Sequence, residues 1–163
     1  MLSYDFAVEG VRFSAWCFLA NDNALGCMLV LESERDQEAR VTVHATNVYG
    51  FPEVSWWGSD GVAANYLPGA DALASTIYAY GDVFVLGADR PSRSHKATPS
   101  RETWQAWLSA NDDASIDHAD MEFPGAMYAL LSYDIAVPGR DGRGLTVALV
   151  RGANQKWTVD AFQ

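Results

Sequence analysis

Two nearly identical nine-residue segments, one near each end of the chain, constrain its fold more than any other feature. They read LSYDFAVEG from Leu2 and LSYDIAVPG from Leu131, and seven of their nine positions are identical. Both contain the aromatic and β-branched residues that strands prefer, and each ends at a glycine that favours a turn. Further strand-like segments and turn signals follow each copy. The pattern therefore predicts a three-stranded antiparallel meander at each end of the chain.

The repeat has two interpretations, duplication of a structural unit or convergence on a favourable strand sequence. A functional version would use Asp5 and Asp134 as a general acid and base, but such mechanisms need a separation that sequence does not reveal. Successive strand residues face opposite sides of a sheet. The architectural version therefore predicts that Tyr4 and Tyr133 occupy corresponding buried positions, with the two aspartates on the opposite face.

The rest of the chain favours the same class of fold. Short apolar segments separated by turn signals indicate further strands before a polar loop. The strongest helix signal follows that loop, because Thr98 suits an N-cap, Pro99 suits the first helical position, and an apolar stripe comes next. We predict a single α+β domain over residues 1–163, dominated by antiparallel β-sheet, with two similar three-stranded meanders at the chain ends and one helix near 98–111.

Charge and hydropathy limit the class of partner. The 163 residues include 21 acidic and 11 basic side chains, giving a formal net charge of −10, and 49% are hydrophobic. This hydrophobic share is enough for a folded core, while the acidic balance disfavours nucleic acid. It favours solubility and a basic protein partner, and solubility alone is the alternative interpretation. No apolar stretch approaches the roughly 20 residues of a membrane-spanning helix, and no leader pattern stands at the N-terminus. We therefore expect a cytoplasmic monomer or homodimer that binds neither nucleic acid nor membrane.

The spacing of Cys17 and Cys27 leaves two hairpin registers open. A turn centred on Asp22 places the two cysteines opposite each other, where a cross-strand disulfide requires a Cα separation of about 4.4–6.8 Å. A two-residue turn at Asp22 and Asn23 places Cys17 opposite Met28 instead. In a cytosolic chain we expect both cysteines to be buried, reduced thiols.

An acidic segment is the leading candidate for a partner-binding surface. Residues 112–122 contain no lysine or arginine, so they could dock a basic protein surface. One of two adjacent tryptophans could add an apolar anchor, because neighbours on a strand face opposite sides. The spacing of a calcium-binding loop is absent, so the alternative is a solvated acidic loop, and we predict no metal site. The predicted partner-binding residues are Asp112, Asp113, Asp117, Asp120, Glu122 and Trp57.

A basic loop precedes the predicted helix. Within twelve residues it holds four of the eleven lysines and arginines of the chain. Cations in front of a helix N-terminus favour a bound anion, and the alternative is an ordinary surface loop. The predicted anion-binding residues are Arg90, Arg93, Lys96 and Arg101.

His44 and Thr46 could form half of a two-histidine phosphodiesterase site, since an imidazole can move a proton while a hydroxyl holds a phosphoryl oxygen. Neither of the other two histidines has a serine or threonine two residues later, so the second half is missing. An ordinary polar strand face is the alternative. No complete nucleotide or esterase motif is present, and we predict no catalytic residue and no cofactor.

These observations favour a binding protein over an enzyme. The leading hypothesis is a small acidic cytosolic inhibitor, of the immunity-protein or antitoxin type, that neutralises a basic toxin or nuclease by surface complementarity. The alternative is a small hydrolase of a phosphate-bearing substrate, with His44 or the pair Asp5 and Asp134 as acid and base and the 90–101 loop binding the anion. A third class is an assembly subunit that uses exposed sheet edges.

Overall fold

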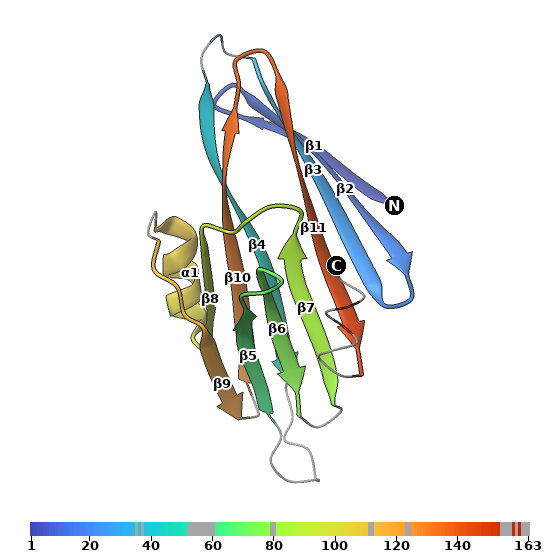
Figure 1. Ribbon diagram of the computed structural model, residues 1–163. Helices are drawn as coiled ribbons and strands as arrows, with labels where there is room; N and C mark the ends of the chain where they lie inside the picture. Colours follow the sequence, from blue (N-terminus) through green and yellow to red (C-terminus); the bar gives the residue numbers. More distant parts are fainter. Residues whose placement is uncertain are drawn as a thin grey trace.

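The computed structural model describes residues 1–34, 36, 38–51, 61–78, 81–110, 113–122, 125–153, 158 and 160. These residues form two antiparallel β-sheets and one short helix (Figure 1), which confirms the predicted fold class at this level. The larger sheet has the order β1 (Leu2–Val8), β2 (Val11–Asn21), β3 (Ala24–Ser33), β11 (Gly142–Gly152), β7 (Asp82–Ala88), β6 (Ala72–Ile77), β5 (Gly61–Leu67) and β9 (His118–Glu122). The smaller sheet has the order β4 (Ala39–Phe51), β10 (Gly125–Val137) and β8 (Ser94–Thr98).

The smaller sheet packs on one face of the larger sheet, and the main core lies between them. Alternate residues of β10 point into this core, and Leu131 and Tyr133 are completely buried there. They pack with Leu31 of β3, Leu73 of β6 and Leu145 of β11, so one apolar cluster joins both sheets. Burial of these side chains provides the main driving force for the two-layer arrangement.

The prediction of a second meander, at the C-terminal end of the chain, is wrong for the strands that the structure describes. The N-terminal meander forms, because β1 pairs with β2 and β2 pairs with β3. At the other end, however, β10 lies between β4 and β8, whereas β11 lies between β3 and β7 in the larger sheet. The expected third strand falls mostly outside the described residues, and Thr158 and Asp160, which are described, are helical. The physical reason is that β10 is buried on both faces over Leu130–Tyr133, which requires a central position under a second layer.

The β1–β2 hairpin extends away from the smaller sheet (Figure 1). Leu2, Tyr4, Phe6 and Val8 share one face of β1, and each is more than half exposed. The Phe6 ring stacks on Phe13 of β2 with ring centroids 4.8 Å apart. The prediction of a buried Tyr4 is therefore wrong, while that of a buried Tyr133 is confirmed, because only the second copy of the repeat has a sheet packed over it.

The helix α1 (Arg101–Ser109) begins two residues later than predicted. Ser100 is the N-cap, and its hydroxyl accepts a hydrogen bond from the Thr103 amide at 3.1 Å. Thr98 instead ends β8, where it pairs with Tyr128 of β10, so it cannot act as the cap. The helix packs on the outer face of the smaller sheet through Trp104, whose ring lies 5.2 Å from that of Tyr128. In the described part of the chain, no helix has the length and apolar character needed to cross a membrane.

Candidate functional site

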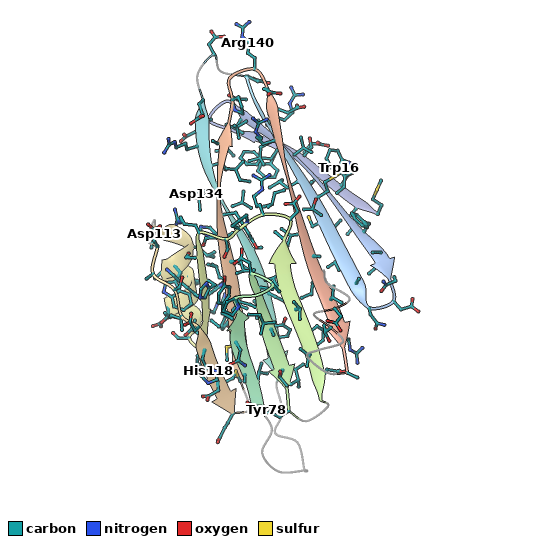
Figure 2. The ribbon with its side chains drawn as sticks, in the orientation of Figure 1. Trp16, Tyr78, Asp113, His118, Asp134 and Arg140 are labelled. Carbon is teal, nitrogen blue, oxygen red and sulfur yellow. The ribbon has the colours of Figure 1, made fainter. Side chains whose placement is uncertain are left out.

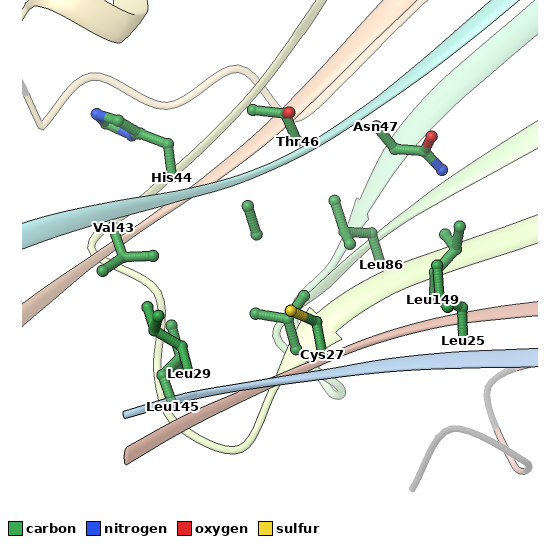
Figure 3. Close-up of a pocket in the computed structure, with 12 residues that line it drawn as sticks. Leu25, Cys27, Leu29, Val43, His44, Thr46, Asn47, Leu86, Leu145 and Leu149 are labelled. Atoms are coloured by element: carbon green, nitrogen blue, oxygen red, sulfur yellow. The ribbon is translucent and has the colours of Figure 1, made fainter. Parts of the chain in front are cut away.

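An apolar cleft of about 400 Å³ lies between the two sheets (Figure 3). Its walls come from β3, β11 and β7 of the larger sheet and from β4, an edge strand of the smaller sheet. The lining residues are Leu25, Cys27, Leu29, Val43, His44, Ala45, Thr46, Asn47, Leu86, Leu145, Val147 and Leu149. Such a lining suits an apolar group, because the polar groups that would orient a charged ligand are few.

His44 is among the lining residues, but its ring lies on the opposite side of β4 from Val43 (Figure 3). The imidazole Nδ1 lies 3.0 Å from the Ser132 hydroxyl, directly across the β4–β10 ladder. Burial lowers the pKa of His44, and the nearby positive charges of Arg93 and Lys96 lower it further. The lowered pKa favours the neutral ring at pH 7, which is the form that a general base requires.

Arg93 is held by two carboxylates on the same outer face. Its guanidinium Nε lies 3.1 Å from Asp113 Oδ1, and its Nη1 lies 3.1 Å from Asp134 Oδ1. The Thr42 hydroxyl donates a further hydrogen bond to Asp134 at 2.9 Å. Only 16% of the Arg93 side chain is exposed, and its guanidinium is already paired with these two carboxylates. Arg93 is therefore poorly placed to bind an external anion.

The other predicted anion-binding residues have separate surroundings. The Arg90 guanidinium donates to the Gly144 carbonyl of β11. Lys96 is only 3% exposed, and its ammonium lies 5.5 Å from the centre of the Trp107 ring. Arg101 is exposed at the first position of α1. The structure thus brings Arg93 and Lys96 near His44, while Arg90 contacts the larger sheet.

The predicted acidic segment lies along one edge of the larger sheet. Part of it is strand rather than loop, since β9 pairs with β5 on one side and with no described strand on the other. The side chains of Asp113, Asp117 and Asp120 are at least 72% exposed, and Glu122 is also exposed. Figure 2 shows Asp113 and His118 on the side of the molecule that carries α1 and β9. Asp112 and Trp57 fall outside the described residues.

Asp113 is paired with Arg93, whereas the two other aspartates of this edge that the structure describes each lie beside a histidine. His95 Nε2 lies 2.6 Å from Asp117 Oδ1, and His118 Nε2 lies 3.3 Å from Asp120 Oδ2. Ile116, 36% exposed, places an apolar side chain beside Asp117. Within the described ranges, no group of three or more histidine, cysteine, aspartate or glutamate side chains is arranged to hold a metal ion.

Sequence reasoning missed a polar cluster centred on Asp71. This carboxylate accepts hydrogen bonds from the Tyr66 hydroxyl at 2.6 Å, the Ser92 amide at 2.5 Å and the Ser92 hydroxyl at 2.7 Å. The His95 ring stacks on Tyr66 with centroids 3.4 Å apart. The hydrogen bond to Asp71 and burial raise the pKa of Tyr66 to about 12. No spacing in the sequence could reveal the cluster, because Ser92 is 21 residues from Asp71.

The two aspartates of the repeat lie in different sheets. Asp5 accepts a hydrogen bond from the Ser14 hydroxyl of β2 at 2.6 Å, and Asp134 accepts from Thr42 of β4. Each carboxylate therefore has its own neighbouring hydroxyl, and no described contact joins the two. These contacts give both residues a structural role between strands.

No family model and no curated protein matches this chain. Its fold is similar to that of a protein from Escherichia coli K12 provisionally named aldose 1-epimerase, with a TM-score of 0.53 and 10% identity over 92% of this chain and 64% of that one. It is also similar to the Slr1438 protein from Synechocystis sp. PCC 6803, with a TM-score of 0.51 and 5% identity over 88% of this chain and 55% of the other.

A third similar structure is a provisionally named kojibiose phosphorylase from the human microbiome, with a TM-score of 0.51 and 9% identity. The match covers 98% of this chain but 19% of that one. This chain therefore spans less than two thirds of each of the three structures. At such low identities the likeness is one of fold, namely the antiparallel two-sheet arrangement.

Proposed function

We propose that this chain is a small acidic cytoplasmic binding protein that recognises a basic protein surface. In its most specific form the proposal is an inhibitor of the immunity-protein or antitoxin type, which neutralises a basic toxin or nuclease. The observation that carries the proposal is the acidic edge, defined as Asp117, Asp120 and Glu122 on and before β9; Asp113 is left out because it is paired with Arg93. Exposed carboxylates stand there beside a strand whose second side has no described strand partner.

Two physical features of the acidic edge support binding to a basic partner. Its carboxylates add a local negative field to a formal net charge of −10, and such fields speed the encounter with a cationic partner. The side of β9 that has no strand partner among the described residues offers backbone donors and acceptors, to which an extended segment of the partner could add as a further strand. Ile116 could then supply an apolar contact within the charged rim.

The test compares two variants with the same change in net charge. The edge variant carries Asp117→Asn, Asp120→Asn and Glu122→Gln. The control variant carries Glu9→Gln, Asp22→Asn and Glu32→Gln, which are exposed acids on the strands and turns at the other end of the sheet. Each immobilised protein is used to capture partners from a lysate of its native host at low and high salt, and the affinity of a captured partner is then measured.

We expect wild type and control to capture the same basic protein in stoichiometric amount at low salt. The edge variant should bind it at least about tenfold more weakly, since three rim charges at about 0.5 kcal/mol each correspond to that factor. Equal affinity of the edge and control variants, or no stoichiometric partner for wild type at low salt, would overturn the proposal.

A phosphate-ester hydrolase is the second candidate, and the neutral His44 beside Ser132, Arg93 and Lys96 favours it. The assay uses p-nitrophenyl phosphate and bis(p-nitrophenyl) phosphate, and His44→Ala is compared with the exposed control His118→Ala. Loss of activity in His44→Ala but not in His118→Ala would support the hydrolase. Absence of activity in the wild-type protein would exclude it. Two of the similar structures carry names of sugar-acting proteins, so binding of mono- and disaccharides should be measured alongside this assay.

A further inference from the structure

The β2–β3 hairpin places the two cysteines directly opposite each other. Cys17 pairs with Cys27 in the ladder, and their Sγ atoms are 3.0 Å apart. Both are free thiols and both are partly exposed. Opposed residues in antiparallel strands have Cα atoms about 4.5–5.5 Å apart, which lies inside the range of about 4.4–6.8 Å found for disulfide-bonded pairs. The backbone therefore needs no rearrangement for a bond to form between the sulfur atoms.

A bulge just before the turn sets this register. Residues 22–23 form the turn, and a regular turn of that length would pair Cys17 with Met28. The ladder instead shifts by one residue ahead of the turn, which brings Cys27 opposite Cys17. Because a shift of one residue moves every side chain to the other face, the bulge decides whether the two thiols meet.

A contact on the opposite face of the β2–β3 hairpin supports the register that pairs Cys17 with Cys27. Gly26 lies under the ring of Phe18, and a Cβ atom added to Gly26 would lie 2.7 Å from Phe18 Cζ. A larger residue at this position would push the ring away from β3. The close contact next to both cysteines keeps β2 and β3 aligned where the thiols face each other.

We propose that Cys17 and Cys27 form a reversible cross-strand disulfide by exchange with a small-molecule disulfide such as oxidised glutathione. The thiolate of one cysteine attacks a glutathione sulfur, the glutathione S–S bond breaks, and the leaving thiolate takes up the proton that the cysteine lost. The second cysteine thiolate then attacks the protein sulfur of this mixed disulfide, and the second glutathione leaves as a thiol. The protein dithiol is oxidised, and one glutathione disulfide is reduced to two thiols.

The surroundings assign different parts to the two sulfur atoms. Burial and the adjoining Cys17 thiol raise the pKa of Cys27 to about 11, so Cys27 alone reacts slowly with an oxidant. Once Cys17 is bonded to glutathione, its thiol no longer contributes to this raised pKa, although burial still does, and the 3.0 Å between the two sulfur atoms places Cys27 to attack Cys17. Cys27 is then the resolving thiol. Cys27 also lines the apolar cleft, so the oxidation state of the pair changes one wall of that cleft.

The experiment measures the product of exchange in the full-length protein. The reduced protein is incubated with defined mixtures of oxidised and reduced glutathione, quenched with acid, alkylated with N-ethylmaleimide and analysed by mass spectrometry. Both cysteines lie in one tryptic peptide, residues 13–35, so its mass reports every outcome. We expect oxidation to remove two hydrogen atoms and to abolish both alkylation adducts, and dithiothreitol should restore them.

Three variants serve as controls. Cys27→Ser should accumulate one glutathione on Cys17. Cys17→Ser should take up glutathione on Cys27 more slowly than Cys27→Ser takes it up on Cys17. The register control, Cys27→Ser with Met28→Cys, keeps two cysteines one residue out of register, and Met28 tolerates replacement because it is 42% exposed. It should take up glutathione without forming an internal bridge.

Two results would overturn the proposal. One is a wild-type protein that ends with separate glutathione adducts, or that stays a dithiol even in oxidised glutathione without any reduced glutathione. The other is a register control that forms its bridge as readily as wild type. Circular dichroism of each variant verifies that the comparison is made between folded proteins.

Discussion

Replacing Asp71 with asparagine removes a negative charge that links the turn after β5 to the segment before β8. Three donors converge on this carboxylate, namely the Tyr66 hydroxyl, the Ser92 amide and the Ser92 hydroxyl. Asp71 has a φ of 46°, in the left-handed region that asparagine also tolerates. The substitution therefore tests the charge and the hydrogen bonds without straining the backbone. Alanine would strain it, because alanine rarely adopts a left-handed conformation.

The magnitude follows from these three contacts. Hydrogen bonds to a charged group contribute about 1.5–3 kcal/mol each, whereas bonds between neutral groups contribute about 0.5–1.5 kcal/mol. Asparagine has one acceptor oxygen and an amide that only donates, so one donor of Tyr66 or Ser92 would face another donor. Because Asp71 is partly exposed, water replaces some of the loss. We expect the free energy of unfolding to fall by about 2 kcal/mol.

Urea unfolding followed by tryptophan fluorescence at pH 7 measures this change. Asp22→Asn serves as the matched control, because Asp22 is exposed in the β2–β3 turn and its replacement should change stability by less than about 0.5 kcal/mol. An Asp71→Asn protein as stable as this control would refute the reasoning. Tyr66→Phe in a double-mutant cycle would assign the share of the Tyr66 hydroxyl.

The same contacts predict how the difference depends on pH. Burial alone would raise the pKa of Asp71, but hydrogen bonds from Tyr66 and Ser92 outweigh burial and lower it below the ordinary value of 3.8. The unfolded chain therefore takes up this proton first as the pH falls. The contribution of Asp71 is complete above pH 3.8 and is lost as the pH falls through the folded pKa. The difference between wild type and Asp71→Asn should shrink accordingly in acid.

Three further predictions use the same unfolding assay or NMR. The Tyr133 hydroxyl is buried and has no hydrogen-bond partner among the described residues, so Tyr133→Phe should keep the stability or raise it by about 1 kcal/mol, and a loss of that size would contradict this. Leu31→Ala, in the core, should cost about 3 kcal/mol, whereas Leu2→Ala on the uncovered hairpin should cost less than about 0.5 kcal/mol; equal costs would contradict the described packing. His44 should titrate by NMR below its ordinary pKa of 6.5, because burial and the charges of Arg93 and Lys96 disfavour protonation; Arg93→Gln should raise this midpoint, and an unmoved midpoint would exclude the charge effect.

The strand periodicity of the sequence was enough to predict an antiparallel fold but not the assignment of strands to sheets. Alternation and turn signals are local, so they located the N-terminal meander correctly. Pairing between β10 and β4 joins residues about 90 apart, such as Asp134 and Thr42. Which distant strand a given strand meets depends on the packing of the whole core, and no local pattern carries that information.

The cysteine register shows the same limit at shorter range. The sequence left two hairpin registers open, one with the cysteines paired and one with a two-residue turn. The structure contains both the cysteine pair and the two-residue turn, because the bulge adds one residue to β2. A bulge has no fixed sequence signal here, since the residue at the shift is an ordinary alanine, Ala20.

The candidate site was partly predictable from charge alone. Counting charges located the acidic edge and the basic loop, but it could not reveal that Arg93 and Asp113 would neutralise each other across the two segments. Nor could it reveal that Lys96 would be buried against Trp107. The availability of a charge depends on its partners in space, so a cluster of charges in the sequence does not by itself predict a binding site.

The two copies of the repeat separate what nine residues can encode from what their neighbours impose. Asp5 and Asp134 each accept a hydrogen bond from the hydroxyl directly opposite in the partner strand, Ser14 in one case and Thr42 in the other. The strand geometry is therefore the same in both copies. Tyr133 is fully buried because the larger sheet covers it, whereas its equivalent on β1 lies beyond the reach of the smaller sheet. The nine residues therefore set the strand geometry of both copies, while the layer packed over a copy decides whether its tyrosine is buried.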